Sequence, residues 1–238
     1  MGKSTISALL VRALHQRTGK VVMAVDADPN SNLGDKLGVK VEHTIGELRE
    51  DLLRNVDSLP PGQSKQEYVE YQMRLATVEG EGFDLLSMGR PEGQGCYCYI
   101  NNILRTFLDM AMDSYDYVVI DNEAGMEHLS RRTTRSMDLL LLVSDPTKVG
   151  VATAARLLDL ARGMGLEVGR SVLLVNGIRS VLHPAVQQEI EALAADRVLH
   201  VPYSEEVLTS SLEGRSVWQL SEADPAFKAV RSALDQML

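Results

Sequence analysis

Four residues at the start of the chain, Gly2-Lys3-Ser4-Thr5, are of the types that bind a phosphate. A glycine lets the backbone approach the anion, the Lys3 ammonium supplies a positive charge, and the Ser4 hydroxyl can bind Mg²⁺. Apolar residues at helical spacing follow at once, so the N–H groups of a helix N-terminus would point at the same anion. An ordinary helix cap could also contain Gly-Lys-Ser, and these residues alone do not decide between the two.

Two carboxylates follow apolar runs that predict buried strands. Asp28 comes shortly after the run 21–25, and Asp121 directly follows the run 117–120. Ligands bind outside the carboxyl ends of the strands in an open α/β sheet. In that position Asp28 could orient or deprotonate an attacking water, and Asp121 could hold Mg²⁺ through water. An Asp-Pro turn explains Asp28 equally well, whereas a hydrophobic strand that ends in aspartate is typical of a Walker-B motif.

Two further strand ends could contact a purine base. Asn176 follows the run 172–175, and its amide can both donate to and accept from a purine edge. Pro202 follows the short run 198–201 and could bring another loop to the same base. A turn is the plainer explanation of Asn176 taken alone.

Both cysteines of the chain lie in one segment, Cys96-Tyr97-Cys98, after a glycine-rich stretch. Their spacing is too short for a comfortable disulfide, and the glycine-rich surroundings do not resemble the core in which a free cysteine is usually buried. Soft metal sites take about four ligands, and two chains across a twofold axis would supply four thiolates. We therefore predict a metal site, with ligands Cys96 and Cys98, at the interface of a homodimer.

The residues that follow apolar runs can lie together only if those runs are strands of one sheet. Four apolar runs lack the polar alternation of half-exposed strands, and they are separated by helical patterns: 21–25, 117–120, 139–143 and 172–175. We predict an α/β fold with one doubly wound, mainly parallel sheet, helices on both faces and a single domain over residues 1–238. The stretch at about 51–82 interrupts this rhythm, and we interpret it as an insertion.

The phosphate-binding pattern also predicts a strand that the printed chain lacks. A loop of the form G-x-x-x-x-G-K-[ST] follows a strand inside the sheet, and no printed residue precedes Met1. Neighbouring strands would keep unpaired backbone groups without it. We expect roughly ten native residues ahead of Met1, which mass spectrometry of the natively expressed protein would detect.

Composition narrows the classes of function. The chain carries 24 Lys and Arg against 33 Asp and Glu, a net charge of −9, which argues against nucleic acid as the main partner. The chain contains no run of about 18 apolar residues that could cross a membrane. Its first residues lack the layout of a signal peptide. Two cysteines cannot make a disulfide framework. We predict a cytoplasmic protein that has no nucleic-acid partner and no stable membrane anchor.

Taken in order, these motifs resemble the deviant-Walker ATPases, a superfamily that includes the septum-site and chromosome-partition ATPases (MinD and ParA) and the nitrogenase iron protein. Within it, the Cys-x-Cys ahead of the run 121–128, Asp-Asn-Glu-Ala-Gly-Met-Glu-His, most resembles the CooC-type ATPase. The resemblance implies a P-loop NTPase fold and ATP hydrolysis with Mg²⁺. It also implies that nickel is inserted into carbon monoxide dehydrogenase or a related acetyl-CoA synthase.

The resemblance further implies a role for each matching residue. Lys3 would be the P-loop lysine, Ser4 the Mg²⁺ ligand and Thr5 a phosphate contact, while Gly2 and Pro202 also belong to the nucleotide site. The remaining roles are these: Asp28 as the switch carboxylate, Asp121 as the Walker-B carboxylate, Asn176 as the adenine contact, and Cys96 and Cys98 as interchain nickel ligands for which Zn²⁺ competes. The second, signature lysine of the family would precede Met1, so we expect ATP hydrolysis coupled to dimer formation to depend on that segment.

Two other functions fit the same superfamily. A reductase resembling the nitrogenase iron protein would bridge an Fe–S cluster between subunits, but it needs a second cysteine shortly after the Asp121 strand, and residues 122–128 contain none. A positioning ATPase of the MinD or ParA type would need a basic surface or an amphipathic C-terminal anchor. The tail 226–238 is not strongly basic, which disfavours that function.

Overall fold

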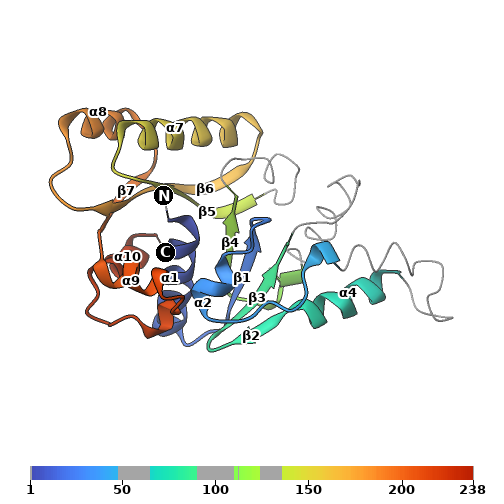
Figure 1. The fold of residues 1–238 in the computed structure, drawn as a ribbon. Helices are drawn as coiled ribbons and strands as arrows, with labels where there is room; N and C mark the ends of the chain where they lie inside the picture. Colours follow the sequence, from blue (N-terminus) through green and yellow to red (C-terminus); the bar gives the residue numbers. More distant parts are fainter. Residues whose placement is uncertain (1, 48–64, 90–109, 112, 124–135, 238) are drawn as a thin grey trace. The chain divides into compact units, whose positions relative to one another are not determined.

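A computed structural model describes residues 2–47, 65–89, 110–111, 113–123 and 136–237 (Figure 1). The chain divides into two compact units, Met1–Ala13 with Thr134–Leu238 as the first and Leu14–Thr133 as the second. The boundary between the units falls inside helix α1 (Lys3–Thr18). Every helix in the described ranges is too short or too polar to cross a lipid bilayer.

The second unit is built on a four-stranded sheet in the order β2-β3-β1-β4. Its strands are β1 (Val22–Ala27), β2 (Val78–Gly80), β3 (Phe83–Ser87) and β4 (Val118–Asn122). β1 runs parallel to β3 and β4, whereas β2 pairs with β3 in the antiparallel direction. All six residues of β1 are buried, which explains an apolar run without polar alternation.

Helices α2 (Leu33–Leu37) and α4 (Lys65–Ala76) belong to the same unit. Met73 and Ala76 of α4 are buried in a core with Met23 and Val25 of β1. The described part of the stretch interpreted as an insertion therefore contains α4 and β2, and α4 packs into the core of its unit. Residues 48–64 lie outside the described part of the chain.

The first unit is built on a three-stranded, all-parallel sheet in the order β5-β6-β7. Its strands are β5 (Ser136–Ser144), β6 (Glu167–Ile178) and β7 (Arg197–Pro202). Its helices are the start of α1, then α7 (Lys148–Gly163), α8 (Pro184–Ala192), α9 (Glu205–Leu212), the 3₁₀ turn η1 (Val217–Gln219) and α10 (Pro225–Met237). Serine is a favoured residue at the N-terminal cap of a helix. At the start of α9 the Ser204 hydroxyl accepts from the Val207 amide, 3.0 Å away.

The predicted mainly parallel α/β architecture is confirmed. Each of the four apolar runs falls on a parallel strand, namely β1, β4, β5 and β6, although β1 and β4 begin one residue after the starts of their runs at Val21 and Tyr117. The described strands form two hydrogen-bonded sheets, and only β2 among them runs antiparallel. The parallel strands carry Asp121, Asn176 and Pro202 toward their carboxyl ends.

Candidate nucleotide site

The start of α1 provides a backbone cradle in the first unit. Gly2 precedes the helix with φ at +77°, a region that favours glycine. A Cβ atom built on Gly2 would lie 2.7 Å from Nδ2 of Asn176. The sequence predicts both Gly2 and Asn176 as nucleotide-binding residues, and the structure brings them together although they are 174 positions apart. No room is left for a side chain at position 2.

Lys3, Ser4 and Thr5 form the first turn of α1, and all three are partly exposed. The amide N–H groups of a first helical turn have no acceptor within the helix, so an anion can accept from them. The residues present fit a bound phosphate, because the backbone donors, the ammonium and the hydroxyl all lie within one helical turn.

The loops after β6 and β7 meet beside Asn176. A bulge at Gly177 separates the pairing of Asn176 with Val201 from the pairing of Ile178 with Pro202. The Tyr203 amide then donates to the Ile178 carbonyl at 2.9 Å. Asn176 and Pro202 thus lie at adjacent strand ends, as their proposed contact with one base requires.

A stacked pair borders these strand ends. The Arg179 guanidinium carbon lies 3.6 Å from the centre of the Tyr203 ring, and the Tyr203 hydroxyl donates to Glu205 at 2.7 Å. That hydrogen bond to Glu205 raises the pKa of the Tyr203 phenol, with a smaller contribution from burial. The Pro202-Tyr203 loop is therefore held in one place by side-chain as well as backbone contacts.

In the second unit, two carboxylates face each other across the β1–β4 ladder. Asp26 pairs with Asp121 in the parallel register, and their exposed fractions are 0% and 2%. Two carboxylates at paired positions of neighbouring strands attract a cation when both are ionised, because its charge relieves their repulsion. A Mg²⁺ ion usually takes only one or two protein carboxylates and completes its shell with water and phosphate oxygens, so Asp121 fits the role predicted for it.

Asp26 was missed by sequence reasoning. Its two carboxylate oxygens accept from the amides of Asp28 and Leu33, at 3.1 and 2.8 Å. Asp26 thereby closes the loop that carries Asp28. The signal in the sequence was its place directly after the apolar run, two residues before Asp28, on which the prediction was made.

Asp28 itself is 9% exposed. One of its oxygens, Oδ1, accepts from the backbone amide and from the side-chain amide of Asn30, at 2.8 and 2.9 Å. The turn that explained Asp28 in the sequence is therefore present in the structure. A turn made by Oδ1 alone is compatible with a second role for the carboxylate.

Burial raises the pKa of Asp26 from 3.8 to about 6, against the lowering effect of the two amide donors; the Asp121 and Asp28 charges also raise it. Between these two pH values the native protein holds a proton that the unfolded chain has released, so its stability falls as the pH rises from about 4 to 6. The pKa difference corresponds to about 3 kcal/mol. Above pH 6 this contribution is lost.

Asp26→Asn should therefore flatten the decline of stability between pH 4 and 6. We expect the variant also to be less stable at low pH by about 1 kcal/mol. Both oxygens of the protonated Asp26 can accept from the two backbone amides, whereas the NH2 group of asparagine can only donate. Urea unfolding at pH 4.5 and 7.5 in EDTA measures both effects. Asp159→Asn, at an exposed position of α7, is the control, and an equal pH dependence in wild type and Asp26→Asn would contradict the prediction.

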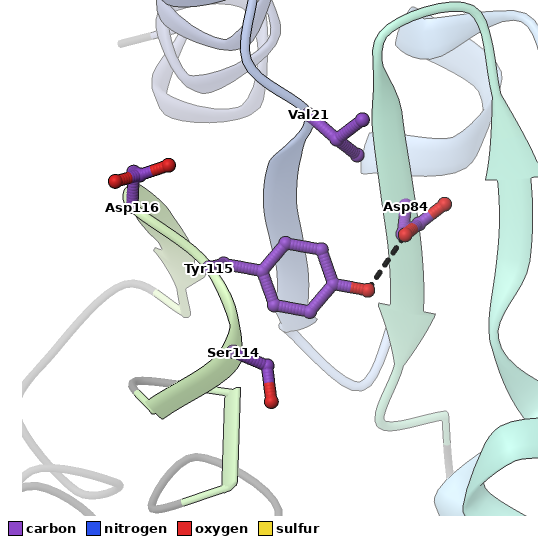
Figure 2. Close-up of a pocket in the computed structure, with 5 residues that line it drawn as sticks. All are labelled: Val21, Asp84, Ser114, Tyr115 and Asp116. Atoms are coloured by element: carbon purple, nitrogen blue, oxygen red, sulfur yellow. Dashed lines mark hydrogen bonds between the residues drawn. The ribbon is translucent and has the colours of Figure 1, made fainter.

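The second unit contains a cavity of about 400 Å³. Figure 2 shows the five residues that line it: Val21, Asp84, Ser114, Tyr115 and Asp116. The Tyr115 hydroxyl donates to Asp84 at 2.6 Å; burial and this hydrogen bond raise the pKa of the phenol. Val21 precedes β1 and Asp116 precedes β4. The cavity is thus at the amino ends of the strands, opposite the edge that carries Asp26, and is not the candidate nucleotide site.

The predicted metal ligands Cys96 and Cys98 lie outside the described residues. Among the residues that are described, no cluster of three or more His, Cys, Asp or Glu side chains could hold a metal ion. The nickel or zinc site therefore stays a prediction from the sequence.

A glycine cradle before a helix and buried carboxylates at parallel strand ends define a nucleotide-binding α/β protein. The model of the CobQ/CobB/MinD/ParA nucleotide binding domain matches residues 1–217. The chain belongs to this family, whose members bind nucleotides.

Two relatives and one solved structure illustrate the similarity. An uncharacterized ATP-binding protein of Methanocaldococcus jannaschii is 37% identical to this chain, and the match covers 100% of this chain and 94% of that protein. The carbon monoxide dehydrogenase accessory protein CooC of Rhodospirillum rubrum is 34% identical over 178 residues, 70% of this chain and 67% of its own. The septum site-determining protein MinD of Pyrococcus horikoshii, solved with Mg-ADP, has a TM-score of 0.66 at 18% identity over 99% of this chain and 91% of its own.

These findings bear on the predictions at different levels. The MinD/ParA type of P-loop NTPase fold, with a mainly parallel sheet and helices on both faces, is confirmed by the family match and the MinD structure. ATP with Mg²⁺ fits the family. The metal cargo, the client enzyme and the role of each site residue belong to the proposal that follows.

Proposed function

We propose that this protein is an ATP-dependent metallochaperone that inserts nickel into carbon monoxide dehydrogenase or a related nickel enzyme. The observation that carries the proposal is the 34% identity to a carbon monoxide dehydrogenase accessory protein. The pair Cys96 and Cys98 supports it, because thiolates suit nickel. ATP binding and hydrolysis would control the homodimer that holds the metal.

In the first unit, we assign the phosphates to Gly2, Lys3, Ser4 and Thr5. The cradle at Gly2 and the exposed first turn of α1 support this assignment. Asn176 would contact adenine by donating and accepting at one edge. Pro202, at the neighbouring strand end, would contribute the second loop at the base.

In the second unit, we assign water activation to Asp28 and Mg²⁺ to Asp121. The resemblance to the family assigns Ser4 to Mg²⁺ as well. Mg²⁺ neutralises charge on the β- and γ-phosphates when it is bound. Asp28 orients the attacking water and accepts its proton, and Asp26 holds the Asp28 loop through two backbone amides. The burial of all three aspartates supports a site from which bulk water is largely excluded.

Nickel is the cargo in this proposal. Cys96 and Cys98 of two subunits would bind one ion, with Zn²⁺ as a competitor for the same four thiolates. Because both subunits supply ligands, a nucleotide that changes the dimer must also change the metal affinity.

A MinD-type positioning ATPase is the second candidate, supported by the fold that the chain shares with MinD. One observation weighs against a membrane anchor in α10. Its apolar residues are buried in its own unit, so they are not presented to a lipid surface: Ala226, Phe227, Val230, Ala233, Leu234 and Met237.

The test of nickel insertion uses a nickel-free carbon monoxide dehydrogenase. The natively expressed protein, Ni²⁺ and MgATP should together restore carbon monoxide oxidation, and a non-hydrolysable ATP analogue should not. Activation that is equal with and without this protein would overturn the proposal. Iron and a coloured cluster in the purified dimer would instead favour the reductase.

Gly2→Ala should weaken ATP binding by at least about tenfold. The new Cβ atom would lie 2.7 Å from Asn176 and would occupy a backbone conformation at φ +77° that alanine rarely adopts. Calorimetric titration with MgATP measures the effect. Gly163→Ala is the matched control, because no atom lies within 4 Å of a Cβ at that position in α7; equal losses in both variants would contradict the role of Gly2.

A further inference from the structure

Arg12 is a buried cation in the middle of helix α1. Its side chain is 6% exposed, and its guanidinium donates to the carbonyls of Val217 and Leu220, at 2.7 and 3.0 Å. It also donates to Glu222 at 2.5 Å. The helix that begins with the phosphate-binding residues is thus fixed to a segment more than 200 positions away.

The same segment extends this contact to α10. The Arg12 guanidinium carbon lies 4.0 Å from the centre of the Phe227 ring. Glu222 also accepts from Arg231 at 2.9 Å, and Arg231 lies over the same ring at 5.8 Å. In Figure 1 α1 accordingly lies beside α10.

The segment 216–224, which we call the bracket, is also hydrogen-bonded to residues at the start of α9. The Ser204 hydroxyl donates to the buried Asp224, and the Ser221 amide donates to Glu206 of α9 at 2.7 Å. Ser204 directly follows the Pro202-Tyr203 loop. The bracket therefore joins α1 to the loop that we assign to the base.

We propose that the bracket fixes the distance between the phosphate-binding and base-binding ends of the nucleotide site, with Arg12 as its main positioning residue. This inference rests on the proposed nucleotide site. Arg12 does not act on phosphate itself, because it lies eight positions after Ser4, about 12 Å along the helix. It acts by holding the helix against the bracket.

The expected consequence is specific to a ligand that contacts both ends. Two linked groups bind more tightly than the separate groups when the protein holds both subsites at the matching distance. A variant in which the bracket holds α1 less firmly loses part of that advantage. Binding must then order the phosphate-binding and base-binding ends of the site, which costs entropy. Each separate group keeps its own contacts, and its affinity is unchanged.

The experiment compares wild type with Arg12→Met, using MgATP, inorganic tripolyphosphate with Mg²⁺, and adenosine as three ligands in calorimetric titrations. Arg12→Met should weaken ATP binding by about tenfold and change the other two affinities by less than about twofold. Glu222→Ala, at a side chain that is 54% exposed, should give a smaller effect of the same kind. Arg12→Lys, which keeps the charge, should partly restore ATP binding.

Arg162→Met is the matched control, because Arg162 also donates to a backbone carbonyl, that of Ala194, but does not touch the bracket. It should bind all three ligands like wild type. Circular dichroism at the titration temperature establishes whether each variant is folded. If Arg12→Met is unfolded, the three titrations of Glu222→Ala replace it as the test. Equal loss for all three ligands, or no loss for ATP, would overturn the bracket. A wild type that binds neither ATP nor tripolyphosphate would instead overturn the proposed function.

Discussion

Replacing both Cys96 and Cys98 by serine is expected to abolish stoichiometric nickel binding while ATP binding stays unchanged. The natively expressed dimer should bind one Ni²⁺, half an equivalent per chain, with a thiolate-to-nickel absorption band. A serine hydroxyl is a poor ligand for nickel, and the chain has no other cysteine. Because the thiols must lose their protons, binding should release protons and weaken as the pH falls.

Equilibrium dialysis with metal analysis measures the stoichiometry. The single variants Cys96→Ser and Cys98→Ser are matched controls that leave two thiolates per dimer, and they should bind nickel more weakly without losing it entirely. Added Zn²⁺ should displace nickel from wild type. If the double variant still binds half an equivalent of nickel, the metal lies elsewhere and the metallochaperone proposal loses its sequence support.

The strands that carry the site were predictable because they are buried on both faces. β1 and β6 appear in the sequence as short, uninterrupted apolar runs, and the polar residues that end such runs must lie at the carboxyl edge of a parallel sheet. The positions of Asp121 and Asn176 followed from this rule alone. Their chemical roles did not, since the rule fixes a place and not a ligand.

β3 was not predicted, because Asp84 interrupts its apolar run. The structure accommodates that carboxylate by a hydrogen bond from Tyr115, a partner 31 positions away that no local pattern reveals. Asp26 was missed for a similar reason. Its buried carboxylate is explained by two backbone amides in the following loop, and the geometry of a loop is not contained in residue types.

Arg12 shows the same limit at long range. A charged residue within an apolar helical pattern predicts exposure on the solvent face. Arg12 is buried instead, because carbonyl acceptors arrive from positions 217 and 220. Only the tertiary fold brings these groups together, so the bracket could not be inferred before the structure.

Asp28→Asn is expected to lower ATP turnover by roughly 10²- to 10⁴-fold, the usual contribution of a positioned proton acceptor. An asparagine keeps a carbonyl oxygen that can accept from the Asn30 amide, so the turn made by Oδ1 is preserved. It cannot take a proton from the attacking water. ATP binding should be nearly unchanged, because Asp28 acts on the water more than on the phosphates.

The comparison with Asp28→Ala separates the two explanations of this residue. Alanine removes both the turn and the proton acceptor, so it should abolish hydrolysis and also lower stability. Asparagine should give the roughly 10²- to 10⁴-fold loss of turnover while stability stays near that of wild type. Phosphate release and thermal unfolding, measured on both variants and on the exposed control Asp35→Asn, give the two readouts. A fully active Asp28→Asn beside an inactive Asp28→Ala would mean that Asp28 serves the turn only. The water would then have to be oriented by another group, and the buried Asp26, which already holds this loop, would be the first to test.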